Sequence, residues 1–220
     1  MKKTIVALVV FINILNAISF EEVKNHEKKY GTLEALSHYR NLASKNNTKA
    51  MIEIAKIYAN GKEVQRSFQT SYEYLQKASK LNDPEAFYLL GKLQLNKKTP
   101  YYNLVDAYNS FIKSSKLNYA PAQNILGVFL VNGVVIEKDF KMAVKYFERA
   151  SKQGLIEAQC NLAFMYASGK GVFPNFGRAH AFAKKGKEIG NKKCIKVWKD
   201  YNLKKYPEDK GWKFNFYNKP

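Results

Sequence analysis

Arginine is scarce in this strongly basic chain. The sequence has 37 lysine and arginine residues against 18 acidic ones. Its only arginines are Arg40, Arg66, Arg149 and Arg178. Proteins that read bases and phosphates rely on the bidentate guanidinium fork, so this composition argues against a nucleic-acid partner. A formal charge of +19 carried mainly by lysine is compatible with a solvated lysine coat, and otherwise favours acidic proteins or anionic envelope surfaces as partners.

Cysteine is scarcer still, with only Cys160 and Cys194 in the whole chain. No histidine or further cysteine lies at ligand spacing from either, which argues against a metal site. In an oxidising compartment the two form a candidate disulfide, and two buried thiols are the alternative. No cofactor is predicted, because Gly169-Lys-Gly lacks the layout of a phosphate-binding loop.

An apolar stretch, Ile5–Leu15, follows two lysines at the start of the chain. It is too short to span a bilayer comfortably and has the layout of a secretory signal, with small residues at Ala17 and Ser19 before a cleavage site at Phe20. A retained interfacial anchor is the alternative. We therefore predict that residues 1–19 are a signal peptide. The mature chain, with a charge of 19 − 2 = +17, is then exported to the periplasm or secreted.

Alanine recurs every 36 residues along the chain. The positions are Ala50, Ala86, Ala122 and Ala158. Five residues after each stands a second small residue, namely Ala55, Gly91, Gly127 and Ala163. A fixed period of this length marks a solenoid of stacked units, which suits extended surface contact rather than one deep catalytic cleft. The predicted fold class is all-α, an α/α solenoid of stacked helix hairpins with no transmembrane span.

Within each period the apolar spacing is helical. First helices are expected near Lys49, Glu85, Pro121 and Glu157. Second helices follow a column of good N-cap residues, Ser67, Asn103, Asp139 and Asn175. The predicted organisation is an N-terminal capping half-repeat at 20–46, four repeats at 47–82, 83–118, 119–154 and 155–190, and a C-terminal half-repeat with an aromatic tail at 192–220.

The third and fourth periods resemble the Sel-1-like repeat, a relative of the tetratricopeptide repeat. The third begins Ala122-Gln-Asn-Ile-Leu-Gly, and the fourth carries Leu162, Tyr166 and Gly169-Lys-Gly-Val172. The step of 36 residues fits this family better than the 34 of tetratricopeptide arrays. The second period departs from the pattern, because Asn96-Lys-Lys-Thr-Pro100 stands where the glycine loop should be. The resemblance implies a protein-binding array, in settings such as secretion, motility, host interaction or envelope maintenance.

Half-units are expected at both ends of the array. From Glu22 to Asn46 one helix is predicted, Thr32–Ser44, and from Lys192 to Lys205 another, stopped by Pro207. Aromatic residues gather within this helix and after it: Trp198, Tyr201, Tyr206, Trp212, Phe214, Phe216 and Tyr217. They are expected either to cover the open end of the array or to dock on a partner protein.

Columns that vary between repeats are the place to look for a binding surface. One stripe on the first helices carries Leu89 and Lys92, then Ile125 and Val128, then Asn161 and Phe164. We hypothesise that its four apolar members form a strip on the concave face, flanked by lysines, that receives a helix or an extended segment of another protein. Packing against neighbouring helices is the alternative, and complete burial of all four would exclude the strip.

Signatures of catalysis are weak. A cysteine-rich branch of the family is described as binding or hydrolysing β-lactams, but its paired cysteines are missing here. A lone Ser110-Phe-Ile-Lys113 matches S-x-x-K without the accompanying S-D-N or K-T-G elements. The predicted function is therefore a non-enzymatic, exported adaptor or scaffold that binds protein, of undecided oligomeric state. A β-lactamase-like hydrolase and an electrostatic binder of anionic envelope polymer are the alternatives.

Overall fold

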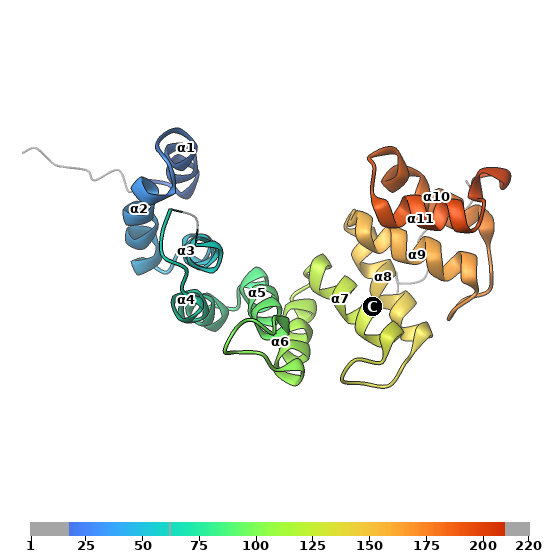
Figure 1. The fold of residues 1–220 in the computed structure, drawn as a ribbon, viewed down its shortest axis with the longest axis horizontal. Helices are drawn as coiled ribbons and strands as arrows, with labels where there is room; N and C mark the ends of the chain where they lie inside the picture. The colour runs from blue at the N-terminus through green and yellow to red at the C-terminus, as the bar shows by residue number, and fades with distance from the viewer. Residues whose placement is uncertain (1–17, 62, 210–220) are drawn as a thin grey trace, which may run out of the picture. The chain divides into compact units, whose positions relative to one another are not determined.

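The protein is all-helical in the computed structural model, which describes residues 18–61 and 63–209 (Figure 1). These residues contain no strand. The elements are α1 (Phe20–Tyr30), α2 (Thr32–Ser44), α3 (Thr48–Asn60), α4 (Phe68–Lys80), α5 (Pro84–Leu95), α6 (Leu104–Lys116), α7 (Ala120–Asn132), α8 (Phe140–Lys152), α9 (Ile156–Ser168), α10 (Phe176–Glu188), α11 (Lys192–Asp200) and the 3₁₀ turn η1 (Leu203–Lys205). This arrangement confirms the predicted all-α fold of consecutive helix hairpins.

The chain divides into two compact units, Met1–Tyr74 and Leu75–Pro220, with the boundary inside α4. In the second unit the hairpins α5–α6, α7–α8 and α9–α10 follow one another in chain order, and α11 packs on α9 and α10. A membrane-spanning helix is not found among the described residues, whose helices are too short or too polar for that role. The predicted signal peptide, residues 1–19, lies almost entirely outside the described part of the chain.

The second helix of each repeat begins at one of the predicted N-cap residues. Oxygen atoms of Ser67, Asn103, Asp139 and Asn175 accept hydrogen bonds from backbone N–H groups of the turn that follows. These bonds satisfy donors that have no partner inside the helix. The backbone N–H of each cap residue also donates to a carbonyl nine residues earlier on the first helix, for example Asp139 to Leu130 at 3.1 Å and Asn175 to Tyr166 at 2.9 Å. One pair of interactions therefore closes each hairpin.

The second repeat closes in the same way despite its different loop. Asn103 N–H donates to the carbonyl of Gln94 at 2.9 Å. Where the other first helices end on a left-handed glycine, α5 ends on the extended Asn96. The buried Thr99 hydroxyl then donates to the carbonyl of Leu93 at 2.8 Å. This bond gives a partner to a carbonyl at the end of α5, as the turn at the left-handed glycine does in the other first helices.

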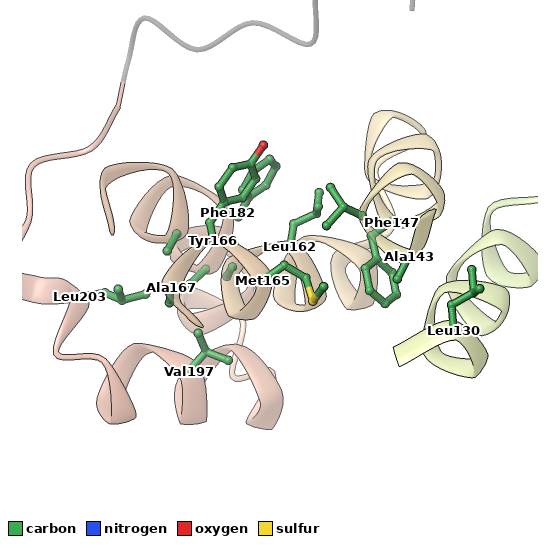
Figure 2. Packing of buried hydrophobic residues seen from close by; sticks show 14 residues of the cluster. Leu130, Ala143, Phe147, Leu162, Met165, Tyr166, Ala167, Phe182, Val197 and Leu203 are labelled. Atoms are coloured by element: carbon green, nitrogen blue, oxygen red, sulfur yellow. The ribbon is translucent and has the colours of Figure 1, made fainter. Parts of the chain in front are cut away.

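The repeating small residues are the innermost positions of the array. All four alanines of the first column, Ala50, Ala86, Ala122 and Ala158, are 0% exposed. One large cluster spans the last two repeats and α11, and it gathers Phe147, Leu162, Met165 and Val197 (Figure 2). Small residues let helix axes approach closely, and the larger ones fill the space between layers.

The N-terminal segment corrects one expectation, because residues 20–46 form two helices rather than one. The predicted helix Thr32–Ser44 is present as α2. Ahead of it α1 begins at a capping box, in which Ser19 Oγ accepts from Glu22 N–H and the Glu22 carboxylate accepts from Ser19 N–H. This Ser-x-x-Glu signal was hidden by its overlap with the proposed cleavage site.

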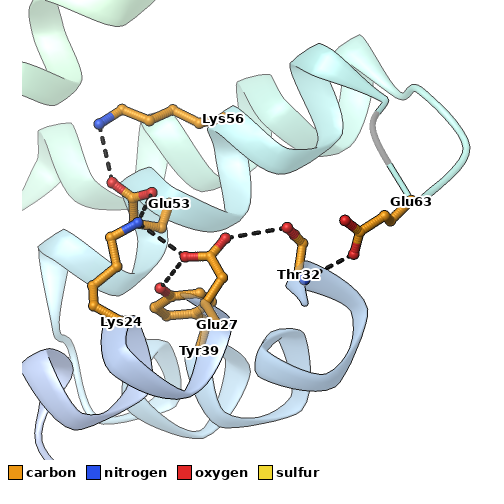
Figure 3. A network of polar contacts seen from close by, with 7 residues as sticks. All are labelled: Lys24, Glu27, Thr32, Tyr39, Glu53, Lys56 and Glu63. Carbon is orange, nitrogen blue, oxygen red and sulfur yellow. Dashed lines mark hydrogen bonds and ion pairs between the residues drawn. The ribbon is translucent and has the colours of Figure 1, made fainter. Parts of the chain in front are cut away.

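A polar network fastens this hairpin to α3 (Figure 3). Lys24 of α1 pairs with both Glu27 and Glu53, at 3.0 and 2.9 Å. Glu63 supplies the missing cap of α2, since its carboxylate accepts from the backbone N–H of Thr32 at 2.8 Å. The first unit therefore carries an ion-pair network at Glu53, on the stripe where later repeats carry apolar residues.

At the C-terminal end the last helix is shorter than expected, since α11 stops at Asp200 and not near Lys205. Asn202 turns the chain with a left-handed backbone, which helical residues do not adopt. The chain then crosses α10, where Tyr206 stacks on Phe176 with ring centroids 4.5 Å apart. Part of the aromatic tail thus covers the last repeat. The remaining tail aromatics, Trp212, Phe214, Phe216 and Tyr217, lie outside the described residues.

Candidate functional site

Three of the six predicted binding residues line a single groove. Val128 of α7 and Asn161 and Phe164 of α9 share a cavity of about 500 Å³ with α11. Val128 and Phe164 are only partly buried, so the strip is not sealed inside the core. The other lining residues are Val131, Asn132, Lys138, Phe140, Phe147, Met165, Lys170, Lys193, Lys196, Val197 and Asp200. We refer to this set as the lysine-rimmed groove.

The other three predicted residues do not line the groove. Ile125 is partly buried against the neighbouring cluster around Phe111 and Phe129. Lys92 is exposed, with its ammonium 5.7 Å from the centre of the Tyr88 ring. Leu89 is partly buried. The structure therefore brings together the third- and fourth-repeat members of the stripe and leaves the second-repeat members apart.

Apolar side chains form the floor of the groove. Phe147 and Met165 are almost completely buried beneath it, and Val197 approaches from α11 (Figure 2). Phe164 adds a partly exposed aromatic surface whose ring lies 6.4 Å from that of Tyr201, edge to face. Covering this floor with apolar groups of a ligand removes apolar surface from water and therefore favours binding.

Positive charge dominates the rim. The lining includes four lysines and one aspartate, a local balance of 4 − 1 = +3. Asp200 is paired with Lys196 at 2.8 Å. Lys170 lies over two rings, 5.4 Å from the centre of Phe164 and 5.6 Å from that of Phe140. Its ammonium is therefore held above the apolar floor by cation–π attraction.

A chain of amide contacts crosses the groove wall. Asn161, 5% exposed, donates from Nδ2 to Asn124 Oδ1 at 2.6 Å and accepts at Oδ1 from the ammonium of Lys193. Desolvation lowers the pKa of Lys193, because burial penalises its charged form. Asn124 and Lys193 did not stand out in the sequence.

A disulfide joins the helices on either side of this wall. Cys160 of α9 and Cys194 of α11 are bridged, with Cα atoms 4.8 Å apart. Gly186 of α10 lies directly against it, and a Cβ at this position would overlap the Cys194 sulfur. The bridge therefore ties the terminal half-repeat, which supplies four lining residues of the groove, to the fourth repeat.

The residues named for the catalytic alternative make other contacts. The Ser110 hydroxyl lies 2.7 Å from the side-chain amide of Gln94, and the Lys113 ammonium lies 5.7 Å from the centre of the Phe87 ring. His180 contacts the carbonyl of Leu203 through Nδ1 at 3.0 Å. Within residues 18–61 and 63–209, no group of three or more His, Cys, Asp or Glu side chains is arranged to hold a metal ion.

Three segments of the chain match a known repeat family. The family model of the Sel1 repeat matches residues 48–83, 120–155 and 156–191. None of these ranges includes the second predicted repeat, which has the divergent loop. No curated protein matches the sequence.

Solved structures share the fold. The protective antigen c5321 of uropathogenic Escherichia coli, described as displaying an SLR fold, superposes with a TM-score of 0.74 at 24% identity over 84% of this chain. A Sel1 repeat protein from Oxalobacter formigenes gives 0.73 at 22% identity over 86%. The immunity protein Pa5087 of Pseudomonas aeruginosa gives 0.55 at 22% over 81%. This chain spans 41%, 80% and 69% of those chains respectively. At these identities the likeness concerns the fold alone.

Proposed function

Because the chain belongs to the Sel1-repeat proteins, whose stacked hairpins present extended binding surfaces, we propose that it acts by binding another protein. The lysine-rimmed groove is the proposed docking site. The observation that carries this choice is the combination of a partly exposed apolar floor, at Val128 and Phe164, with a rim of net positive charge. Sites that bind chain segments commonly combine an apolar trough with a charged border.

The groove chemistry specifies the partner segment. Apolar side chains would cover Phe164 and Val128, and carboxylates on either side would meet Lys138, Lys170 and Lys196. A carboxylate reaching the wall would also meet Lys193, which already donates to Asn161. We therefore propose a helix or extended segment in which acidic residues flank apolar ones.

The proposed setting is the cell envelope, where the protein acts as an adaptor or scaffold after export. Two observations support export. The first is the signal-like composition of residues 1–19, and the second is the Cys160–Cys194 bridge, since disulfides persist in oxidising compartments.

Two other activities are separable from this one. A β-lactam hydrolase would need Ser110 activated by Lys113, and these side chains contact Gln94 and Phe87 instead. Attachment to an anionic polymer would depend on the total charge of +19, or +17 without the signal, and not on which lysines carry it.

The decisive experiment compares two charge-reversed variants in the native envelope. Lys138→Glu/Lys170→Glu changes the groove rim, and Lys98→Glu/Lys116→Glu changes exposed lysines that do not line it. Both shift the net charge by −4, and neither alters a buried side chain. Crosslinking and affinity capture, followed by mass spectrometry, would identify partners retained by each variant.

We expect the rim variant to lose the wild-type partner by about tenfold and the control to retain it, since each charged rim contact contributes up to about 1 kcal/mol. Equal losses in both variants would support attachment to an anionic polymer. Retention of the same partners at wild-type levels by the rim variant would remove the groove from consideration.

A further inference from the structure

A second, larger cavity lies on another face of α8. Its volume is about 810 Å³, and it is enclosed by α8, the end of α9, the loop before α10 and the start of α10. Ligand sites in proteins commonly have volumes in this range. The cavity shares no lining residue with the lysine-rimmed groove. Docking in the groove therefore leaves this cavity without a role.

An exposed aromatic residue stands at this cavity on a fixed loop. Phe173 lines the cavity and is 93% exposed, the highest value among the large hydrophobic residues described. In the same loop Gly171 has a left-handed backbone and packs so closely on α8 that a Cβ would lie 2.4 Å from the Phe140 carbonyl. Pro174 packs against Gly169, where a Cβ would come within 2.9 Å of the proline ring. An apolar surface held in solvent in this way marks a contact site.

A carboxylate is buried in the wall of the cavity. Glu148 is 7% exposed and accepts a long hydrogen bond, 3.5 Å, from the hydroxyl of the buried Tyr166. Desolvation raises the pKa of Glu148, although nearby cations oppose this shift. A carboxylate can accept up to about four hydrogen bonds, so Glu148 has capacity for a further donor. The fold therefore keeps a strong acceptor where its charge costs stability, which is typical of a functional site.

Positive charge flanks this acceptor. Lys141 and Lys145 line the cavity from α8, and both are exposed. They stand four residues apart on the helix, where like charges repel each other. Arg178 also lines the cavity and is paired with Asp209 at 3.3 Å. This rim repels a cationic ligand, whereas the carboxylates of an acidic ligand are attracted to the two lysines.

We propose that this α8–α10 cavity binds an aromatic side chain with its own hydrogen-bond donor, tyrosine or tryptophan, from an acidic segment of another protein. In this arrangement the phenol O–H or indole N–H donates to Glu148, and the ring packs against Val144 and Phe173. Carboxylates beside the aromatic residue meet Lys141 and Lys145. A neutral donor satisfies the buried acceptor without bringing a cation past the basic rim. The site is separate from the lysine-rimmed groove, and its preference for a donor does not depend on docking there.

Two matched peptides test the role of the donor. Each is a blocked pentapeptide with two glutamates on either side of a central residue, which is tyrosine in one peptide and phenylalanine in the other. The peptides differ by one hydroxyl group. With the full-length chain, isothermal titration calorimetry should give a dissociation constant about tenfold lower for the tyrosine peptide, the gain expected from one hydrogen bond to a charged acceptor.

Substitutions of Glu148 assign this preference to its carboxylate. Glu148→Leu removes the acceptor and should bind the two peptides equally. Glu148→Gln keeps a neutral acceptor, which forms hydrogen bonds about half as strong, and should retain a preference of about threefold. Both variants remove a charge that is costly to bury, so the fold is kept, and circular dichroism checks this.

Changes elsewhere in the cavity should affect both peptides alike. Lys141→Glu/Lys145→Glu should weaken the binding of each peptide by about tenfold, because two charged contacts are reversed. Phe173→Ser should also weaken both, and its matched control is Ile189→Ser, at an apolar residue that is 65% exposed and does not line the cavity. The groove variant Lys138→Glu/Lys170→Glu should keep the preference for tyrosine, so the failure of one docking site is distinguishable from the failure of the other.

Equal affinity of the wild type for the two peptides would overturn the proposal, as would a tyrosine preference that survives Glu148→Leu. Tighter binding of a tyrosine peptide flanked by lysines would also overturn it, since the cavity would then select cations. The same holds if neither glutamate peptide binds at millimolar concentration.

Discussion

The ring of Phe147 on α8 packs directly against the backbone of Gly127 on α7, where a Cβ would come within 2.5 Å of the ring. One period earlier, Phe111 packs against Gly91 in the same way, with a closest approach of 2.7 Å to a Cβ at that position. In the fourth repeat the two columns carry Ala163 and Ala183, each fully buried. In the second and third repeats the two columns therefore share one volume, which glycine and phenylalanine fill. The first repeat carries Ala55 and Leu75 at the same positions.

Gly127→Ala is expected to destabilise the second unit by about 1–3 kcal/mol, because the added methyl group forces the Phe147 ring out of its place. Urea denaturation followed by circular dichroism measures the change. Gly127→Ala/Phe147→Leu should lose less stability than the sum of the two single variants, because the smaller side chain vacates the space that the methyl group needs. Additive losses would contradict the shared-volume explanation.

Most of the fold was predictable because it depends on columns that repeat. The four buried alanines and the four caps were each identified from the 36-residue step alone, and each takes its expected place. The predictions that were wrong concern the two ends of the array, where the 36-residue period stops. The capping box at Ser19 and the left-handed turn at Asn202 are local signals that have no equivalent in the repeats.

The groove was predictable only in part. Val197 and Asp200 stand 36 residues after Asn161 and Phe164, so extending the columns one step beyond the fourth repeat would have found them. Lys138 and Lys170 come from loops, whose side-chain directions no helical period fixes. The role of Lys193 depends on how α11 packs, which tertiary contacts decide.

Removal of the disulfide is expected to destabilise the last repeat and the groove with it. For a separation of 34 residues, the loop-closure entropy corresponds to about 3–4 kcal/mol. Wild-type protein should therefore unfold at a lower temperature in dithiothreitol, whereas Cys160→Ala/Cys194→Ala should unfold early in both conditions. If dithiothreitol leaves the melting temperature of the wild type unchanged, the bridge contributes little to stability.

Glu148→Gln is expected to stabilise the protein at neutral pH. Burial raises the pKa of Glu148 despite the nearby cations Lys152, Arg178 and Lys145. The folded state thus holds the proton more tightly than the unfolded chain. As a result, stability falls as the pH rises from about 4.3 through the folded pKa. The variant should therefore gain stability at pH 7 and almost none at pH 4.

Denaturation curves at the two pH values measure this difference, and the exposed Glu137→Gln is the matched control. An equal gain at both pH values would point to packing and not to ionisation.

Tyr39→Phe is expected to weaken the first unit through Glu27. The Tyr39 hydroxyl, on a residue that is 0% exposed, donates to Glu27 Oε2 at 2.8 Å (Figure 3). Its loss should cost about 1–2 kcal/mol, because the acceptor is a partly buried carboxylate. Burial by itself raises the pKa of Glu27, but hydrogen bonds from Lys24 and Tyr39 outweigh it, and the net shift is downward. The stabilisation is therefore present above the unfolded pKa and is lost as the pH falls through the folded value.

Hydrogen exchange of the amides of α1 and α2 reports on this unit, which contains neither tryptophan. Exchange should accelerate in Tyr39→Phe at pH 6, and the gap between variant and wild type should narrow toward pH 3 as Glu27 is protonated. In a Glu27→Gln background, the same Tyr39→Phe change should cost less, because a neutral amide is the weaker acceptor. An undiminished cost in that background would assign the effect to the packing of the ring and would remove the carboxylate from the explanation.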